Sequence, residues 1–185
     1  MKRVVTGHSK DGKSIFLSKG GLPDGIGLES LPVIEQIELW ATGADPKIPC
    51  EPGEPPQLGK SFFPGLGETR FRFTVFPPAE VILNAIRAGV DPVAVHEEMV
   101  QKWPGMGESM EKDNPGMHTT DTVDYGIVIS GEVSLELDDG EAVDLEPGDC
   151  VVQNGTRHAW RNHGPDPCVM AFVMFGVARA SQGSQ

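Results

Sequence analysis

Hydrophobic and polar residues alternate with period two in many short segments of this chain, which is the pattern of β-strands. The clearest case is residues 69–76, where Phe71, Phe73 and Val75 fall on one face of the predicted strand. Turn-forming Gly, Pro, Asp and Asn residues separate the segments. Further strands are predicted at residues 3–6, 14–18, 34–40, 125–129, 133–137, 143–145, 150–153 and 169–177.

Two short helices interrupt this pattern. Residues 79–88 place Val81, Ile82, Ala85 and Ile86 on one helical side, and Gly89 follows as a C-cap. After them, Asp91 offers an N-cap, Pro92 suits the first helical position, and apolar residues continue to Trp103 at helical spacing. The prolines between residues 42 and 64 block both helix and central strand, which predicts an ordered surface loop there: Pro46, Pro49, Pro52, Pro55 and Pro56.

Composition and charge narrow the class of protein. With 185 residues and 38% hydrophobic residues, the chain suits one globular domain. A formal net charge of -12 repels phosphate backbones and anionic lipid, so nucleic acid is not an expected partner. No run is long enough to span a membrane, and the N-terminus lacks the apolar core of a signal peptide. Cys50, Cys150 and Cys168 are odd in number and have no Cys-x-x-Cys spacing, so neither a disulfide framework nor a zinc knuckle is indicated. A cytoplasmic protein is therefore expected.

The most specific motif lies between Gly116 and Asn162. Its first part runs from His118 through Asp124 to Gly131. A turn follows at Pro147-Gly148-Asp149, and the second part places Gly155, His158 and Asn162 at fixed spacing. Together these residues resemble the two-part signature of the cupin superfamily, as in single-domain, RmlC-like jelly-roll members.

The resemblance implies an all-β double-stranded β-helix, the jelly-roll cupin barrel. It covers about the C-terminal third to half of the chain. Three positions depart from the family pattern: Thr120 stands where a second His is usual, Asp124 replaces Glu, and Gln153 replaces Pro.

One compact domain with four parts is predicted. Residues 1–78 supply N-terminal strands and the Pro-rich loop, which pack on or extend the barrel sheets. Residues 79–104 form the helical insertion, 105–178 hold the cupin core motifs, and 179–185 are a polar C-terminal tail. The resemblance also implies a homodimer, paired through sheet extension by the N-terminal strands.

The predicted site lies inside the barrel. His118, Thr120, Thr122 and Asp124 are spaced by two, so their side chains share one face of a strand. The resemblance brings His158 to them from a neighbouring strand. His118, His158 and Asp124 would then form a two-His, one-carboxylate set for a divalent metal (Fe, Mn, Ni or Zn). The metal can also be absent, because Thr120 replaces a ligand.

Three functions remain open from the sequence. The first is a cupin-type enzyme that acts on a small organic molecule with the metal bound. The second is a metal-free isomerase, cyclase or lyase in which His118 or His158 is the acid or base, oriented by Asp121 or Asp124. The third is a non-catalytic module that binds a small molecule. Residues predicted to contact the substrate are Thr120, Tyr125, Trp160 and Arg157.

Overall fold

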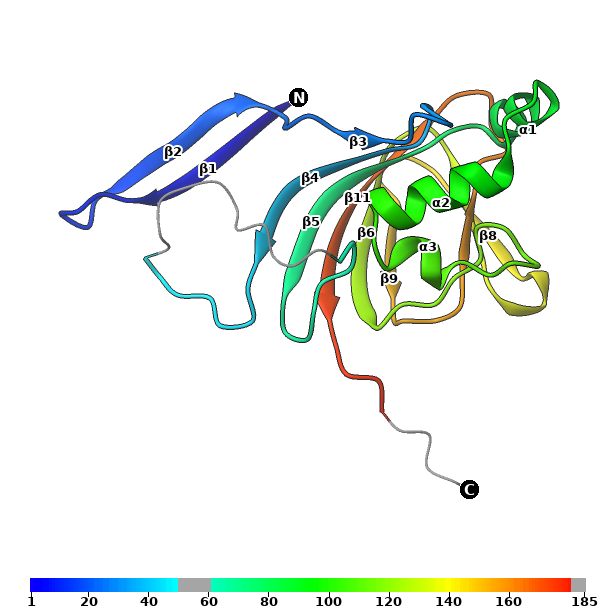
Figure 1. Cartoon of the computed structure of the whole chain (residues 1–185). Coiled ribbons are helices and arrows are strands. Elements are labelled where there is room, and N and C mark those ends of the chain that lie inside the picture. The colour runs from blue at the N-terminus through cyan, green and yellow to red at the C-terminus, as the bar shows by residue number, and fades with distance from the viewer. Residues whose placement is uncertain (50–60, 181–185) are drawn as a thin grey trace.

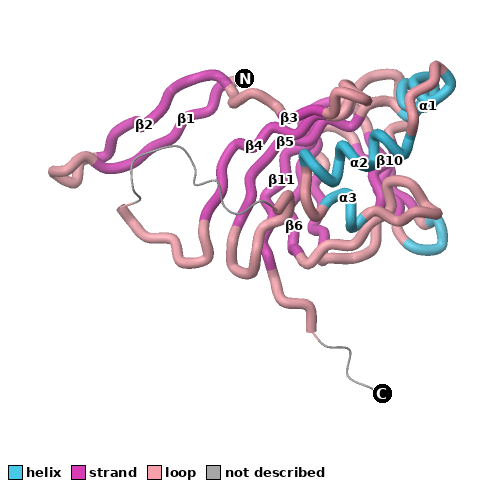
Figure 2. Tube along the Cα trace, in the orientation of Figure 1, coloured by secondary structure: helices cyan, strands magenta, loops and turns pink. Residues whose placement is uncertain are grey.

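Strands make up most of the chain in the computed structural model, which describes residues 1–49 and 61–180. The strands are β1 Lys2–His8, β2 Ser14–Gly21, β3 Ile26–Gly27, β4 Glu35–Thr42, β5 Thr69–Phe76, β6 Thr122–Ser130, β7 Val133–Glu136, β8 Ala142–Leu145, β9 Cys150–Gln153, β10 Ala159–Arg161 and β11 Cys168–Gly176. The helices are α1 Ala79–Arg87, α2 Pro92–Lys102 and α3 Met106–Ser109, with a 3-10 turn at Asp138–Gly140. The fold is therefore all-β with one helical insertion, as predicted (Figure 2).

The strands form two sheets of a jelly roll and a separate hairpin. One sheet has six strands in the order β3-β4-β5-β11-β6-β9, and the other has three in the order β10-β7-β8. β11 pairs antiparallel with both β5 and β6, so segments distant in sequence become neighbours. β3 and β4 extend the larger sheet, whereas β1 and β2 pair only with each other and stand apart from it (Figure 1).

The larger sheet turns a mixed polar and apolar face to the barrel interior. On β5, Arg70, Arg72 and Thr74 are buried, while Phe71 and Phe73 point to the other side. The apolar core fills the rest of the interior between the sheets, and its buried members are Val128, Val133, Leu145, Cys168, Met170, Phe172 and Met174. Strand alternation thus gives this sheet an apolar outer face as well as a packed inner one.

The helical insertion builds a second apolar cluster beside the barrel. Leu28, Leu31 and Trp103 are its buried members, and partly buried residues of all three helices pack against them. As predicted, Asp91 caps α2, because its carboxylate accepts a hydrogen bond from the Val93 N–H at 2.9 Å. The Phe62 ring lies 6.0 Å from the Trp103 ring and links this cluster to the sheet.

Some predictions fall on residues outside the described ranges. They concern Cys50, Pro52, Pro55 and Pro56 of the Pro-rich loop, and the tail beyond residue 180. In the part that the structure describes, no helix is both long and apolar enough to cross a membrane.

Candidate functional site

His118 and His158 face each other directly inside the barrel. The two residues form an isolated antiparallel bridge, and each backbone N–H donates to the other's carbonyl at 2.9 Å. Their ring centroids are 4.3 Å apart. Both side chains are buried. The structure therefore brings together the two histidines that the sequence motif singled out.

Backbone carbonyls set the tautomer of both rings. Nδ1 of His118 lies 2.9 Å from the Gly116 carbonyl oxygen, and Nδ1 of His158 lies 2.9 Å from that of Thr156. A carbonyl oxygen can only accept, so each Nδ1 carries the proton and each Nε2 keeps a lone pair. Two adjacent imidazoles whose Nε2 lone pairs are not engaged by the backbone can bind a cation or accept a proton.

Burial also keeps both rings neutral. It lowers the pKa of His118, and it lowers the pKa of His158 to about 4, with a further contribution from the charge of His118. Neutral imidazole is the form that binds metals and acts as a base. The pair is therefore ready for either role at neutral pH.

Thr120, Thr122 and Asp124 are buried along the segment that leads into and along β6. The two threonine hydroxyls lie 2.8 Å apart. Burial raises the pKa of Asp124 to about 6, while a hydrogen bond from Thr122 and the charge of Arg72 act in the opposite direction. Oδ1 of Asp124 is buried without a hydrogen-bond partner, so this carboxylate has an unused acceptor.

The predicted metal set is assembled only in part. Within residues 1–49 and 61–180, no three His, Cys, Asp or Glu side chains are grouped closely enough to hold a metal ion. His118 and His158 are together, whereas Asp124 lies in the buried interior without joining them. The two histidines can supply two nitrogen ligands to a metal. Asp124 has one unpaired carboxylate oxygen, but it does not group with the histidines in this structure.

Two predicted substrate contacts lie elsewhere. Tyr125 is 51% exposed on the outer face of the larger sheet, because side chains alternate along β6 and Asp124 points inward. Arg157 is bound to carboxylates at the surface: Nε and Nη2 donate to Glu111 at 2.6 Å, and Nη1 donates to Asp138 at 2.7 Å. Tyr125 therefore faces away from the barrel interior, and the Arg157 guanidinium is engaged by two carboxylates.

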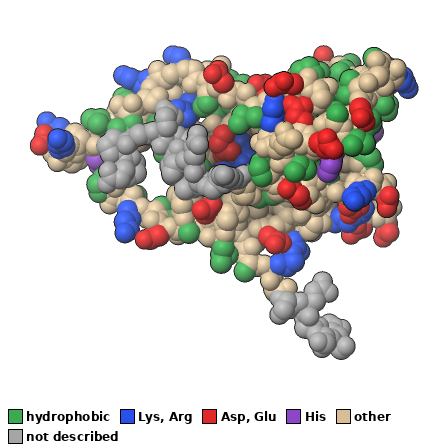
Figure 3. Space-filling view, viewed as in Figure 1, with side chains coloured by type: hydrophobic (Ala, Val, Ile, Leu, Met, Phe, Trp, Pro, Cys, Tyr) green, Lys and Arg blue, Asp and Glu red, His purple; other side chains and the backbone are tan. Residues whose placement is uncertain are grey.

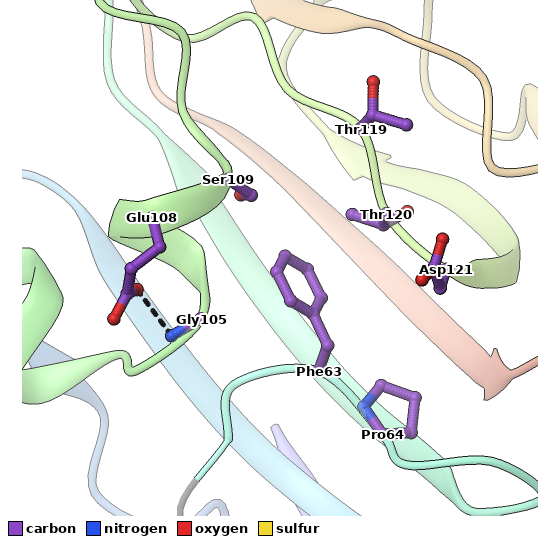
Figure 4. A pocket seen from close by; sticks show the side chains of 8 residues that line it. All are labelled: Phe63, Pro64, Gly105, Glu108, Ser109, Thr119, Thr120 and Asp121. Carbon is purple, nitrogen blue, oxygen red and sulfur yellow. Dashed lines mark hydrogen bonds between the residues drawn. The ribbon is translucent and has the colours of Figure 1, made fainter.

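Trp160 and Thr120 lie close to the site. The Trp160 ring packs edge-on against His158 at 5.9 Å and against Phe172 at 5.5 Å, so it supports the histidine ring from the core side. Thr120 lies at the wall of a pocket of about 370 Å³. Figure 4 shows this pocket between α3 and the segment that carries Thr119, Thr120 and Asp121, with the Phe63 ring lying between them.

An ion pair at the inner face of the sheet was missed from the sequence. Arg72 Nη2 donates to Glu38 at 2.9 Å and to the Phe62 carbonyl at 2.6 Å, and the Phe62 ring lies 3.9 Å from its Cζ. Arg72 is only 3% exposed. The arginines that alternate with Phe71 and Phe73 were the available signal, but alternation does not say which face of a strand points inward.

Comparisons with known proteins agree with the motif. Residues 108–175 match the cupin domain family. A segment of 59 residues is 51% identical to phomopsin biosynthesis cluster protein C' of Diaporthe leptostromiformis, covering 32% of this chain and 28% of that protein. A segment of 61 residues is 48% identical to a cupin-domain-containing oxidoreductase of Hypocrea virens, covering 31% of each. The similarity thus spans less than a third of either relative.

Among solved structures, a putative ethanolamine utilization protein Q from Salmonella typhimurium aligns with a TM-score of 0.42 at 11% identity. The alignment covers 96% of this chain and 98% of that chain.

Proposed function

We propose that this chain, which belongs to the cupin superfamily through its domain at residues 108–175, is an enzyme that acts on a small organic molecule in the barrel. The observation that carries the proposal is the buried, neutral pair of His118 and His158, whose Nε2 lone pairs are not used by the backbone. Relatives named as oxidoreductases and as biosynthesis cluster proteins favour a redox step on a biosynthetic intermediate.

A divalent metal, Fe, Mn, Ni or Zn, fits this pair. Histidines that bind metals usually donate their other N–H to a carbonyl or carboxylate, and both Nδ1 atoms do so here. Asp124 is proposed as the third ligand, because its Oδ1 is buried and unpaired. A bound metal would supply Lewis acidity and, if it is Fe(II), redox chemistry. The chain itself holds both rings in one tautomer and excludes water from them.

Elemental analysis of protein purified without chelators tests this proposal. We expect about one metal per chain, or uptake of one equivalent of added Fe(II), Mn(II), Ni(II) or Zn(II). Chelation should remove the metal and turnover together. Protein that neither carries nor takes up any of these four metals would contradict the metal proposal.

A metal-free acid–base enzyme is the second candidate. It is favoured because Asp124 does not group with the histidine pair, so the described residues offer no three-ligand set. Two neutral imidazoles and a carboxyl group with a pKa of about 6 can exchange protons near neutral pH. In this case turnover survives chelation and still requires the histidines.

A homodimer is also proposed, through the outer face of the larger sheet. Two rows of uncharged, mostly apolar side chains cross five paired strands: Ile37, Phe73, Ala171, Ile127 and Cys150, then Trp40, Phe71, Val173, Tyr125 and Val152. These rows contain no charged residue. By contrast, charged side chains are scattered over the side of the molecule that carries the helices (Figure 3).

The exposed area on this face suits a second copy of the chain. Phe71, Tyr125, Ile127, Ile129 and Val152 are 39–62% exposed. At ~150–250 Å² per large side chain, these five present on the order of 400 Å². The partly exposed members of the rows add to this, toward the ~800 Å² per partner of a stable interface. An uncharged face also avoids repulsion between two chains that each carry a net charge of -12.

Replacing Val152 by Lys is expected to convert the dimer to a monomer, because it places a charge in the middle of an apolar contact. Light scattering should give twice the 19.9 kDa chain mass for the wild type and the single mass for the variant. Val93→Lys on α2 is the matched control, since Val93 is also 62% exposed. A wild-type monomer, or a dimer in both variants, would contradict this interface.

A further inference from the structure

The buried polar atoms that lack partners gather around one arginine. Among the described residues they belong to Glu38, Arg72, Trp103 and Asp124. Arg72 is bonded to Glu38, and the Phe62 ring lies on its guanidinium and next to the Trp103 ring. Asp124 acts on Arg72 through its charge, although no ion pair joins them. Glu38, Arg72 and Asp124 therefore belong to strands of the larger sheet, whereas Trp103 lies in the cluster beside it.

Arg72 has the largest number of buried polar atoms without a hydrogen-bond partner among these residues. A guanidinium has five N–H donors, and here Nη2 uses its two on Glu38 and the Phe62 carbonyl. Nε and Nη1 are buried with no partner, so three donors remain unused. Buried polar groups are nearly always hydrogen-bonded, and a buried charge is normally paired. The described residues supply no acceptor for these donors.

We propose that Arg72 binds a carboxylate group of the small molecule in the barrel, through its Nε and Nη1 donors. In the metal-free protein the Oδ1 atom of Asp124, to which the proposed metal would otherwise bind, accepts a hydrogen bond from a hydroxyl or amino group of the same molecule. The ligand is thus a hydroxy or amino carboxylic acid. Charge-assisted bonds from a guanidinium suit a carboxylate better than a neutral acceptor.

One pocket is lined by residues that neighbour this proposed site along the chain. The pocket in Figure 4 is lined by Phe63 and Thr120. Phe63 directly follows Phe62, whose carbonyl accepts a hydrogen bond from Arg72. The hydroxyl of Thr120 lies 2.8 Å from the hydroxyl of Thr122, which precedes Asp124 by two residues. The inference rests on the proposed function only in placing the ligand inside the barrel.

Matched acids and amides test the inference. Lactate against lactamide, and benzoate against benzamide, are titrated into chelator-treated protein and followed by ligand-observed NMR. We expect each acid to bind wild type at least tenfold more tightly than its amide. Arg72→Gln should remove this preference, whereas Arg87→Gln, which makes the same change of charge on the exposed surface of α1, should keep it.

Circular dichroism checks that each variant folds. If Arg72→Gln does not fold, the double variant Glu38→Gln/Arg72→Gln replaces it in the binding test, because this variant removes both charges of the ion pair. Equal binding of acid and amide by wild type overturns the inference, as does an acid preference that survives in the Arg72 variant. So does a crystal soaked with lactate that shows only water at Arg72. A protein that binds no metal and shows no turnover, but still binds each acid more tightly than its amide, would contradict the proposed metal enzyme and support this inference.

Discussion

Replacing His158 by Ala is expected to lower the affinity for a divalent metal by at least ~100-fold, since even loss of an outer-shell partner costs 10–100-fold. His118→Ala should have an effect of similar size, because the two rings face each other at 4.3 Å and offer equivalent Nε2 atoms. Competition against a chromogenic chelator measures the affinity directly and does not require the substrate. With the metal gone, turnover should be lost as well.

The control for these variants is His163→Ala, which removes an exposed imidazole one residue beyond Asn162. It should bind metal like wild type. If both site variants bind metal normally, the metal lies elsewhere and the proposed ligands are wrong. If no protein binds metal but the site variants still lose turnover, the acid–base enzyme is the correct alternative.

The strand pattern allowed most of the fold to be predicted from the sequence. Period-two alternation located β5, β6 and β11, and the Asp138–Gly140 turn between β7 and β8 came from its Asp and Gly residues. The helical insertion followed from the Asp91 cap and the apolar spacing up to Trp103. These features are local, so neighbouring residues along the chain are enough to specify them.

The site was only partly predictable, because it depends on which face of each strand points inward. The spacing of His118, Thr120 and Asp124 predicted a shared buried face, and all three are buried. The same alternation puts Tyr125 outside, which the motif did not reveal. The interior position of Arg72 was equally hidden, since an arginine in an alternating strand is normally assigned to the solvent side.

Replacing Gly131 by Ala is expected to destabilise the fold by about 3 kcal/mol, through a clash of ~1–3 kcal/mol added to backbone strain of ~1–2 kcal/mol. Gly131 has φ +73°, and an added Cβ would lie 2.5 Å from the Pro167 carbonyl oxygen and 2.8 Å from Cα of Cys168. These are backbone atoms at the start of β11, so they cannot move aside without disturbing the pairing with β6.

Gly148→Ala separates the two contributions. Gly148 also has positive φ, +99°, but an added Cβ there would meet nothing within 4 Å. It should therefore lose only the strain, ~1–2 kcal/mol. Urea unfolding of both variants measures the difference. Equal losses would mean that the close approach of the β6–β7 turn to β11 contributes nothing, and that the glycine of the motif serves backbone conformation alone.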